Sequence, residues 1–217
     1  PEDYCRENGG IIFPNPNAPT GLFMPLDQVE EIVRANEDVI VIVDEAYIDF
    51  GAWSAMELTK KYDNLLVVQT FSKSRAMAGM RIGFAAGNPE LIRALNNVKY
   101  SYNSYTMSLA AQELGAAALR DRDYFEETRK KIISTRERAK KRLRELGFSF
   151  PDSMTNFIFA EHCRAEARPM FQAMKEAGIY VRYFDKPGLD NRLRITIGTE
   201  EEMEQLYRFL ERYLADR

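Results

Sequence analysis

Short apolar runs separated by polar segments mark the first ninety residues, and each run has the length of a β-strand. They occupy residues 11–13, 39–43, 65–68 and 82–86. The second run is continuous rather than alternating, which is typical of a strand covered on both faces. Between the first two runs, apolar residues recur at helical spacing after a proline, at Leu26, Val29, Ile32 and Val33. Strands alternating with helices predict a mostly parallel α/β sheet with crossover connections.

The pattern changes in the second half of the chain. Residues 108–147 have helical periodicity, and Gly147 fits a helix C-terminal cap. Beyond Pro151 the pattern predicts a small α+β region, with strands at 156–160, 179–184 and 193–197 and a helix at 168–177. A final helix is expected to start at Thr199, where Glu202 completes a capping box. We therefore expect two domains, residues 1–147 and 148–217.

Composition narrows the function classes. The chain has 217 residues, 45% hydrophobic and 29% charged, with a net charge of −3, which excludes disordered, collagenous and disulfide-scaffold proteins. A charge so near neutral predicts neither nucleic acid nor an anionic membrane as partner. Cys5 and Cys163 lie far apart without metal-ligand spacing, so we expect reduced thiols, no metal site and a cytoplasmic location. The single histidine, His162, is expected at the surface.

Three polar clusters carry candidate chemistry, and two of them follow strands of the predicted sheet. Asp44-Glu45-Ala46-Tyr47 comes after the second run, and Thr70-Phe71-Ser72-Lys73-Ser74 comes after the third, with Arg81 eight residues beyond Lys73. The remaining cluster is the turn at residues 15–21, Asn-Pro-Asn-Ala-Pro-Thr-Gly. Taken singly, they could be a capping aspartate, a solvated loop and a tight turn. Ligands of such sheets bind outside the carboxyl ends of the strands, and a desolvated lysine there can be a carbonyl nucleophile.

In this order and spacing, the clusters resemble the fold-type-I pyridoxal-phosphate aminotransferases, and most resemble the histidinol-phosphate aminotransferase branch. The similarity runs from about residue 10 to residue 214 and includes Val181-Arg182 and Leu193–Thr199 near the C-terminus. It implies part of a three-layer large domain with a mostly parallel sheet, followed by a small α+β domain. The resemblance also implies an N-terminal segment before Pro1, and we expect the chain to be a C-terminal fragment with poor activity alone.

The resemblance gives each cluster a role toward the cofactor, pyridoxal 5′-phosphate. Lys73 would bond to the cofactor aldehyde and then move a proton as general acid and base. Asp44 would pair with the pyridine nitrogen and keep it protonated, and Tyr47 would donate a hydrogen bond to the phenolic oxygen of the ring. The phosphate would be held by three residues: Thr70, Ser72 and Arg81.

Three further residues take implied roles. Arg194 matches the position that receives the α-carboxylate of an amino-acid substrate, and with Arg182 it would help place a phosphate-bearing substrate. The asparagine that usually touches the phenolic oxygen directly precedes Pro-Thr-Gly, but here that position is Ala18. The role is carried to Asn17, one residue earlier, or else Tyr47 serves that oxygen alone.

The resemblance predicts a homodimeric transaminase acting on a small-molecule amine and a 2-oxo acid, with histidinol phosphate and 2-oxoglutarate, in histidine biosynthesis, as the specific hypothesis. Two alternatives share the chemistry: an aromatic amino-acid aminotransferase and a threonine-phosphate decarboxylase. A third, of another class, is a non-catalytic pyridoxal-phosphate-binding regulatory domain. A fourth is a folded scaffold without activity, its open sheet edge covered by self-association.

Overall fold

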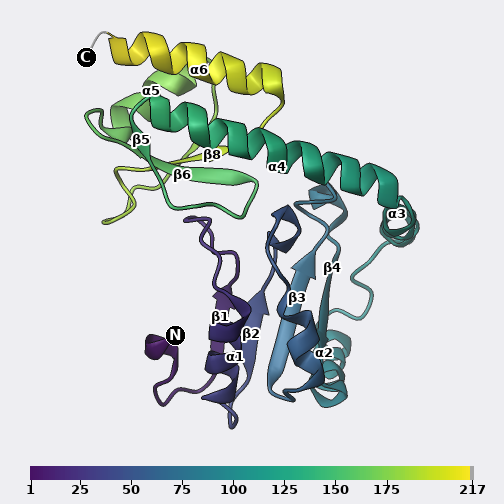
Figure 1. Cartoon of the computed structure of the whole chain (residues 1–217). Helices are drawn as coiled ribbons and strands as arrows, with labels where there is room; N and C mark the ends of the chain where they lie inside the picture. The colour runs from purple at the N-terminus through teal and green to yellow at the C-terminus, as the bar shows by residue number, and fades with distance from the viewer. Residues whose placement is uncertain (216–217) are drawn as a thin grey trace. The chain divides into compact units, whose positions relative to one another are not determined.

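A four-stranded sheet organises the first half of the chain in the computed structural model, which describes residues 1–215 (Figure 1). Its strand order is β1-β2-β3-β4, with bounds Ile11–Pro14, Val41–Asp44, Leu65–Thr70 and Gly83–Gly87. The first three strands are parallel, and β4 runs antiparallel to β3. The mostly parallel α/β sheet predicted from the apolar runs is therefore confirmed.

Helix α1 (Leu26–Arg34) covers one face of this sheet. Its apolar stripe, Val29, Ile32 and Val33, is fully buried with the alternate strand residues Val41 and Val43. Neighbouring residues of a strand point to opposite sides of the sheet. The residues on the side away from α1 are less covered. Ile40 of the second run remains 45% exposed, and Ile12 of the first run remains 71% exposed. The exposure of Ile40 shows that the second run is not covered on both faces in the described chain, so that expectation is wrong there.

The first half of the chain also contains short 3-10 helices and two α-helices that follow the last strand of the sheet. The 3-10 helices are η1 (Glu2–Tyr4), η2 (Ile48–Phe50), η3 (Ala55–Lys60) and η4 (Ala78–Met80). Two α-helices follow β4, α2 (Pro89–Tyr102) and α3 (Leu109–Arg120). The apolar pattern did not predict α2, which buries no residue, although Asn88 caps it by accepting from the Glu90 amide and Pro89 stands at its first turn.

A second sheet organises the C-terminal part. Its strand order is β5-β6-β8-β7, all antiparallel, with bounds Phe148–Ser149, Phe157–His162, Leu193–Thr196 and Arg182–Tyr183. The long helix α4 (Arg122–Glu145) precedes it, α5 (Ala167–Glu176) follows β6, and α6 (Glu200–Ala215) ends the described chain. Leu143, Ile158, Met170 and Leu210 are buried together in this core. The predicted small α+β region is thus confirmed, with β7 shorter than the expected strand at 179–184.

The two sheets belong to separate compact units. The first comprises Pro1–Asn17 and Phe23–Glu127, and the second comprises Ala18–Leu22 and the chain from Thr128 onward. The segment Ala18–Leu22 joins the second unit through a hydrogen bond from the Met154 amide to the Gly21 carbonyl, 2.9 Å. The division into domains at residues 147 and 148 stays a prediction.

Two local predictions in the second unit have different outcomes. The capping box is confirmed: the Thr199 amide donates to Glu202 Oε2 at 2.7 Å, and the Glu202 amide donates to Thr199 Oγ1 at 3.2 Å. His162, expected at the surface, is only 7% exposed. It is buried because its ring lies 3.0 Å from the Leu146 carbonyl through Nε2, while Nδ1 accepts from the amides of Arg164 and Ala165.

None of the helices in the described part of the chain combines the length and hydrophobicity that crossing a membrane requires. Within residues 1–215, no three side chains of histidine, cysteine, aspartate or glutamate gather into a potential metal site.

Candidate active site

A cavity of about 460 Å³ opens at the carboxyl ends of β2 and β3 in the first unit. Five of the residues singled out in the sequence line it: Asp44, Thr70, Ser72, Lys73 and Arg81. They come together because β2 and β3 are parallel neighbours in which Asp44 lies opposite Val68. Gln69, Ile82 and Gly83 line the same cavity without having been proposed. The location is the one where parallel α/β sheets bind ligands.

The first of these polar groups is Asp44, the last residue of β2. Its Oδ1 accepts a hydrogen bond from the Ala46 amide at 3.0 Å, which orients the carboxylate toward the start of the following turn. That bond involves one oxygen only. A ligand nitrogen entering the cavity can therefore meet the carboxylate of Asp44 without breaking the turn.

Hydroxyl and guanidinium groups face the cavity from the end of β3, from the loop after it and from the turn before β4. Thr70 Oγ1 lies 2.9 Å from Ser72 Oγ and also accepts from the Ser72 amide at 3.1 Å. Arg81 follows η4 in a left-handed conformation, with φ +56°, and donates from Nη1 to the Ala78 carbonyl at 2.8 Å. Two hydroxyls and a guanidinium with further N–H groups make a donor set suited to an anion such as a phosphate.

The amine of Lys73 lies close to Tyr47. Its Nζ is 5.4 Å from the centroid of the Tyr47 ring, a cation–π contact, although the lysine side chain is otherwise exposed. Tyr47 stands directly before η2, at the N-cap position. The lysine and the tyrosine therefore approach each other from two different loops, one after β3 and one after β2.

A buried acid without a role in the sequence-based predictions, Glu45, is hydrogen-bonded to Gln69 of the cavity wall. Glu45 is 1% exposed and accepts from Ser54 Oγ at 2.6 Å, the Ala55 amide at 2.6 Å and Gln69 Nε2 at 2.8 Å. Burial raises the pKa of Glu45, and the three hydrogen bonds act against that rise. One signal in the sequence could have indicated the burial of Glu45: side chains alternate along an extended chain, so Glu45 points away from the side to which Asp44 points.

In the turn at residues 15–21, the asparagine that is held in place by hydrogen bonds is Asn15, whereas the predicted site residue was Asn17. Asn15 is 1% exposed; its side chain donates to the Met24 carbonyl at 2.9 Å and accepts from the Met24 amide at 2.8 Å. Its own amide donates to the Asp44 carbonyl at 2.9 Å. Asn17 does not line the cavity in the described structure, and its contact with a cofactor ring stays a prediction.

Arg182 and Arg194 lie in the second unit, directly opposite each other on β7 and β8. Both guanidinium groups approach the ring of Phe184, at 5.4 Å and 5.7 Å from its centroid. The guanidinium of Arg194 also lies 5.0 Å from the ring of Phe157, and its buried Nε has no hydrogen-bond partner among residues 1–215. Two cations close to one aromatic ring can bind an anion, and their role toward a substrate stays a prediction.

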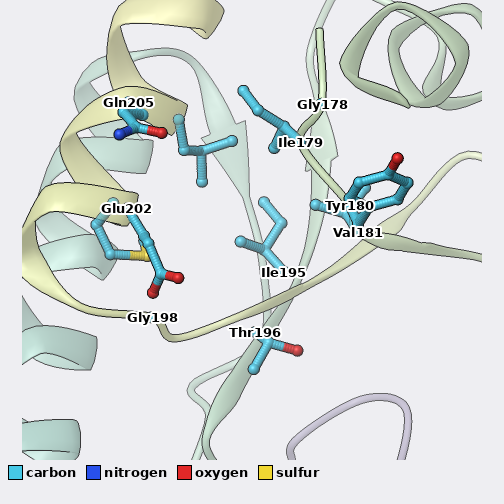
Figure 2. A pocket seen from close by; sticks show the side chains of 11 residues that line it. Gly178, Ile179, Tyr180, Val181, Ile195, Thr196, Gly198, Glu202 and Gln205 are labelled. Carbon is cyan, nitrogen blue, oxygen red and sulfur yellow. The ribbon is translucent and has the colours of Figure 1, made fainter. Parts of the chain in front are cut away.

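A second hollow, of about 380 Å³, lies within the second unit between α6 and the segment Gly178–Val181 (Figure 2). Ile179, Val181 and Ile195 form its apolar wall. Its carboxylate, Glu202, already accepts from the Thr199 amide as part of the helix cap. None of the predicted site residues lines this hollow, so it is not the candidate active site.

Comparison with known proteins gives the fold and the site a family. Residues 2–210 match the family model for aminotransferase class I and II. The chain is 55% identical over 203 residues to the histidinol-phosphate aminotransferase of Brachyspira hyodysenteriae, covering 93% of the chain and 57% of the relative. It is 49% identical over 214 residues to the histidinol-phosphate aminotransferase of Lactococcus lactis subsp. cremoris, covering 99% and 60%.

A solved structure agrees with these relatives. The chain superimposes on the histidinol-phosphate aminotransferase of Sinorhizobium meliloti, in complex with pyridoxal-5′-phosphate, with a TM-score of 0.83 at 28% identity, covering 96% of the chain and 58% of that protein. The chain therefore spans about 57–60% of the length of the relatives it matches. The resemblance predicted from the clusters is confirmed, and the chain belongs to the aminotransferase class I and II family.

Proposed function

We propose that this chain is part of a pyridoxal-phosphate-dependent aminotransferase that exchanges an amino group between histidinol phosphate and 2-oxoglutarate, in histidine biosynthesis. The observation that carries the proposal is the cavity that unites Lys73 and Asp44 with Thr70, Ser72 and Arg81. The names of relatives at about 50% identity support the choice of substrate.

The donor set of this cavity fits pyridoxal phosphate group by group. The carboxylate of Asp44 suits a protonated pyridine nitrogen, and the hydroxyls of Thr70 and Ser72 with the guanidinium of Arg81 suit the phosphate. Lys73 brings a primary amine for the aldehyde. When bound, the cofactor supplies a ring that withdraws electrons from the substrate carbon.

The residues of the chain have separate tasks in this chemistry. Lys73 would hold the cofactor aldehyde through Nζ, and the same amine would carry the proton to and from the substrate carbon. The Tyr47 hydroxyl would donate a hydrogen bond to the phenolic oxygen of the cofactor ring, with Asn17 as the second candidate donor. Asp44 keeps the pyridine nitrogen protonated by placing a negative charge beside it.

Arg194 and Arg182 take the anionic ends of the substrate in this proposal. A carboxylate or a phosphate can accept a forked pair of hydrogen bonds from a guanidinium, which fixes both distance and orientation. Two observations support such a role: the two arginines are paired on β7 and β8, and the Nε of Arg194 has no hydrogen-bond partner among the described residues. We further propose that the parent protein is a cytoplasmic homodimer.

A single-turnover comparison of amines tests the substrate. The chain is loaded with pyridoxal phosphate and mixed with equimolar histidinol phosphate, histidinol, phenylalanine or threonine phosphate, and loss of the cofactor absorbance band is followed. We expect histidinol phosphate to act fastest, with Arg194→Ala and Arg182→Ala removing its advantage over histidinol. An equal response to histidinol, or a faster response to phenylalanine or threonine phosphate, contradicts the proposed substrate.

A further inference from the structure

A partly buried hydrogen bond joins the two loops that carry the candidate catalytic groups. Ser74, the residue after Lys73, is 6% exposed, and its hydroxyl donates to Asp49 Oδ2 at 2.5 Å. Asp49 belongs to η2, which begins directly after Tyr47. The bond therefore connects the loop of the lysine to the loop of the tyrosine at a point next to both.

The loop that carries Asp49 is firmly held. Its two neighbours in η2, Ile48 and Phe50, are 5% and 0% exposed. The Ile48 amide donates to the Glu45 carbonyl at 3.1 Å, and the Phe50 amide donates to the Tyr47 carbonyl at 3.2 Å. Because both sides of Asp49 are anchored in this way, its carboxylate is a fixed acceptor rather than a mobile surface group.

The loop that carries Lys73 is held through its backbone, whereas the side chain of the lysine is exposed. Phe71 is 4% exposed, and its carbonyl accepts from the Met77 amide at 3.1 Å. The Ala76 amide donates to the Lys73 carbonyl at 3.1 Å. The lysine side chain is exposed and meets the Tyr47 ring at 5.4 Å. The backbone at residues 73 and 74 sets the point from which this side chain starts, and it therefore biases where Nζ can reach.

We propose that Asp49 is a positioning residue, which acts through Ser74 to hold the backbone of Lys73 so that Nζ stays between the Tyr47 ring and the cavity. The inference rests on the proposed function, because it concerns the amine that captures the cofactor. Asp49 itself does not line the cavity. Its effect is therefore on the selectivity and rate with which Lys73 meets a carbonyl ligand.

The bond between Ser74 and Asp49 could also serve stability alone, since a buried hydroxyl requires a hydrogen-bond partner wherever it lies. The two roles differ in what a variant does. Loss of a structural bond lowers the stability of the unit, whereas loss of a positioning bond also changes which lysine the ligand reaches. The chain offers a matched control: the Tyr62 hydroxyl donates to Glu30 Oε1 at 2.8 Å, a hydroxyl–carboxylate bond of the same unit that involves α1.

The experiment measures where pyridoxal phosphate attaches. Each protein is incubated with substoichiometric pyridoxal phosphate, reduced with borohydride and digested, and the label on Lys73 is compared by mass spectrometry with the label on the exposed lysines Lys60 and Lys99. In the unmodified chain and in Tyr62→Phe, we expect most of the label on Lys73. In Ser74→Ala and Asp49→Ala, we expect the ratio of Lys73 label to other label to fall about tenfold.

Conservative variants separate geometry from stability. Ser74→Thr keeps the hydroxyl and Asp49→Asn keeps an accepting oxygen, so both are expected within about twofold of the unmodified ratio. The thermal midpoint of each variant is measured alongside, to show that the labelled proteins are folded at the labelling temperature. If folded Ser74→Ala keeps the labelling ratio of the unmodified chain and only its thermal midpoint falls, as in Tyr62→Phe, the inference about Asp49 is overturned while the proposed function stands. No preference for Lys73 in the unmodified chain overturns both the inference and the proposed function.

Discussion

Replacing Glu45 tests whether the buried carboxylate fastens the loop after β2 to the neighbouring strand. Three donors point at this side chain: Ser54 Oγ, the Ala55 amide and Gln69 Nε2. Glu45→Ala leaves them facing an apolar gap, and each buried donor without a partner costs about 1–3 kcal/mol. The Ser54 hydroxyl can turn to another partner, and the carboxylate itself was costly to bury. We therefore expect the unit to lose about 3 kcal/mol of stability.

The isosteric variant Glu45→Gln provides the contrast. Its amide oxygen can still accept from the Ala55 amide, while rotation of the Ser54 hydroxyl and a flip of the Gln69 amide can match the new NH₂ group. We expect a cost of about 1 kcal/mol, well below that of the alanine variant. The substitution also removes a titrating group whose pKa is raised by burial in the folded unit. Because the folded state takes up the proton first, the unmodified chain should gain stability relative to Glu45→Gln as pH falls from 7 toward 4.5.

The assay uses the only tryptophan of the chain, Trp53, which immediately precedes Ser54 in the same unit. Its fluorescence in a urea titration follows unfolding of that unit, which matters because a chain of two units need not unfold in one step. Far-UV circular dichroism of the same samples follows both units together. A Glu45→Ala loss below about 1 kcal/mol, or equal losses for the alanine and glutamine variants, would refute the reasoning.

Three further predictions concern other parts of the chain. His162 accepts hydrogen bonds from two backbone amides through Nδ1, and burial lowers the pKa of its ring. The stability that the neutral ring gives to the second unit should therefore be complete above pH 6.5 and be lost as the pH falls below 6.5. Thermal melts at pH 5–7 measure this, and His162→Gln should show a flatter pH profile. Thr199→Ala removes one half of the capping box and should cost about 1 kcal/mol in chemical denaturation, whereas no loss would contradict a capping role. Arg81→Ala should weaken pyridoxal phosphate binding about 10–100-fold in an absorbance titration, because a charge-assisted bond to the phosphate is lost; the exposed Arg93→Ala is the matched control, and equal affinities for both would remove Arg81 from the phosphate site.

The sequence was sufficient to predict the location of the candidate site. Asp44 and Lys73 each follow an apolar run, and parallel strands bring the ends of such runs to one edge of a sheet. The final helix was equally predictable, because a capping box is a local contact between residues three apart. The two predictions have different physical causes: the capping box is local, whereas the site depends on the general rule that parallel strands end at one edge of a sheet.

Side-chain contacts between distant segments could not be predicted from the sequence. Glu45 meets Gln69 across 24 residues, and Asp49 meets Ser74 across 25, and no spacing rule indicates either pair. His162 was misplaced for a similar reason: its burial comes from the Leu146 carbonyl and from the local turn that presents two amides to Nδ1. Such pairs become visible only when the fold sets which loops are neighbours.

The attachment site of pyridoxal phosphate tests the central claim most directly. The chain and its Lys73→Ala variant are titrated with pyridoxal phosphate, reduced with borohydride, and analysed by absorbance and peptide mass spectrometry. We predict a near-visible band in the unmodified chain, with the reduced cofactor on the peptide containing Lys73, and neither signal in the variant. A band of equal strength in Lys73→Ala, or a label spread over surface lysines in the unmodified chain, would contradict the assignment of this cavity as the cofactor site.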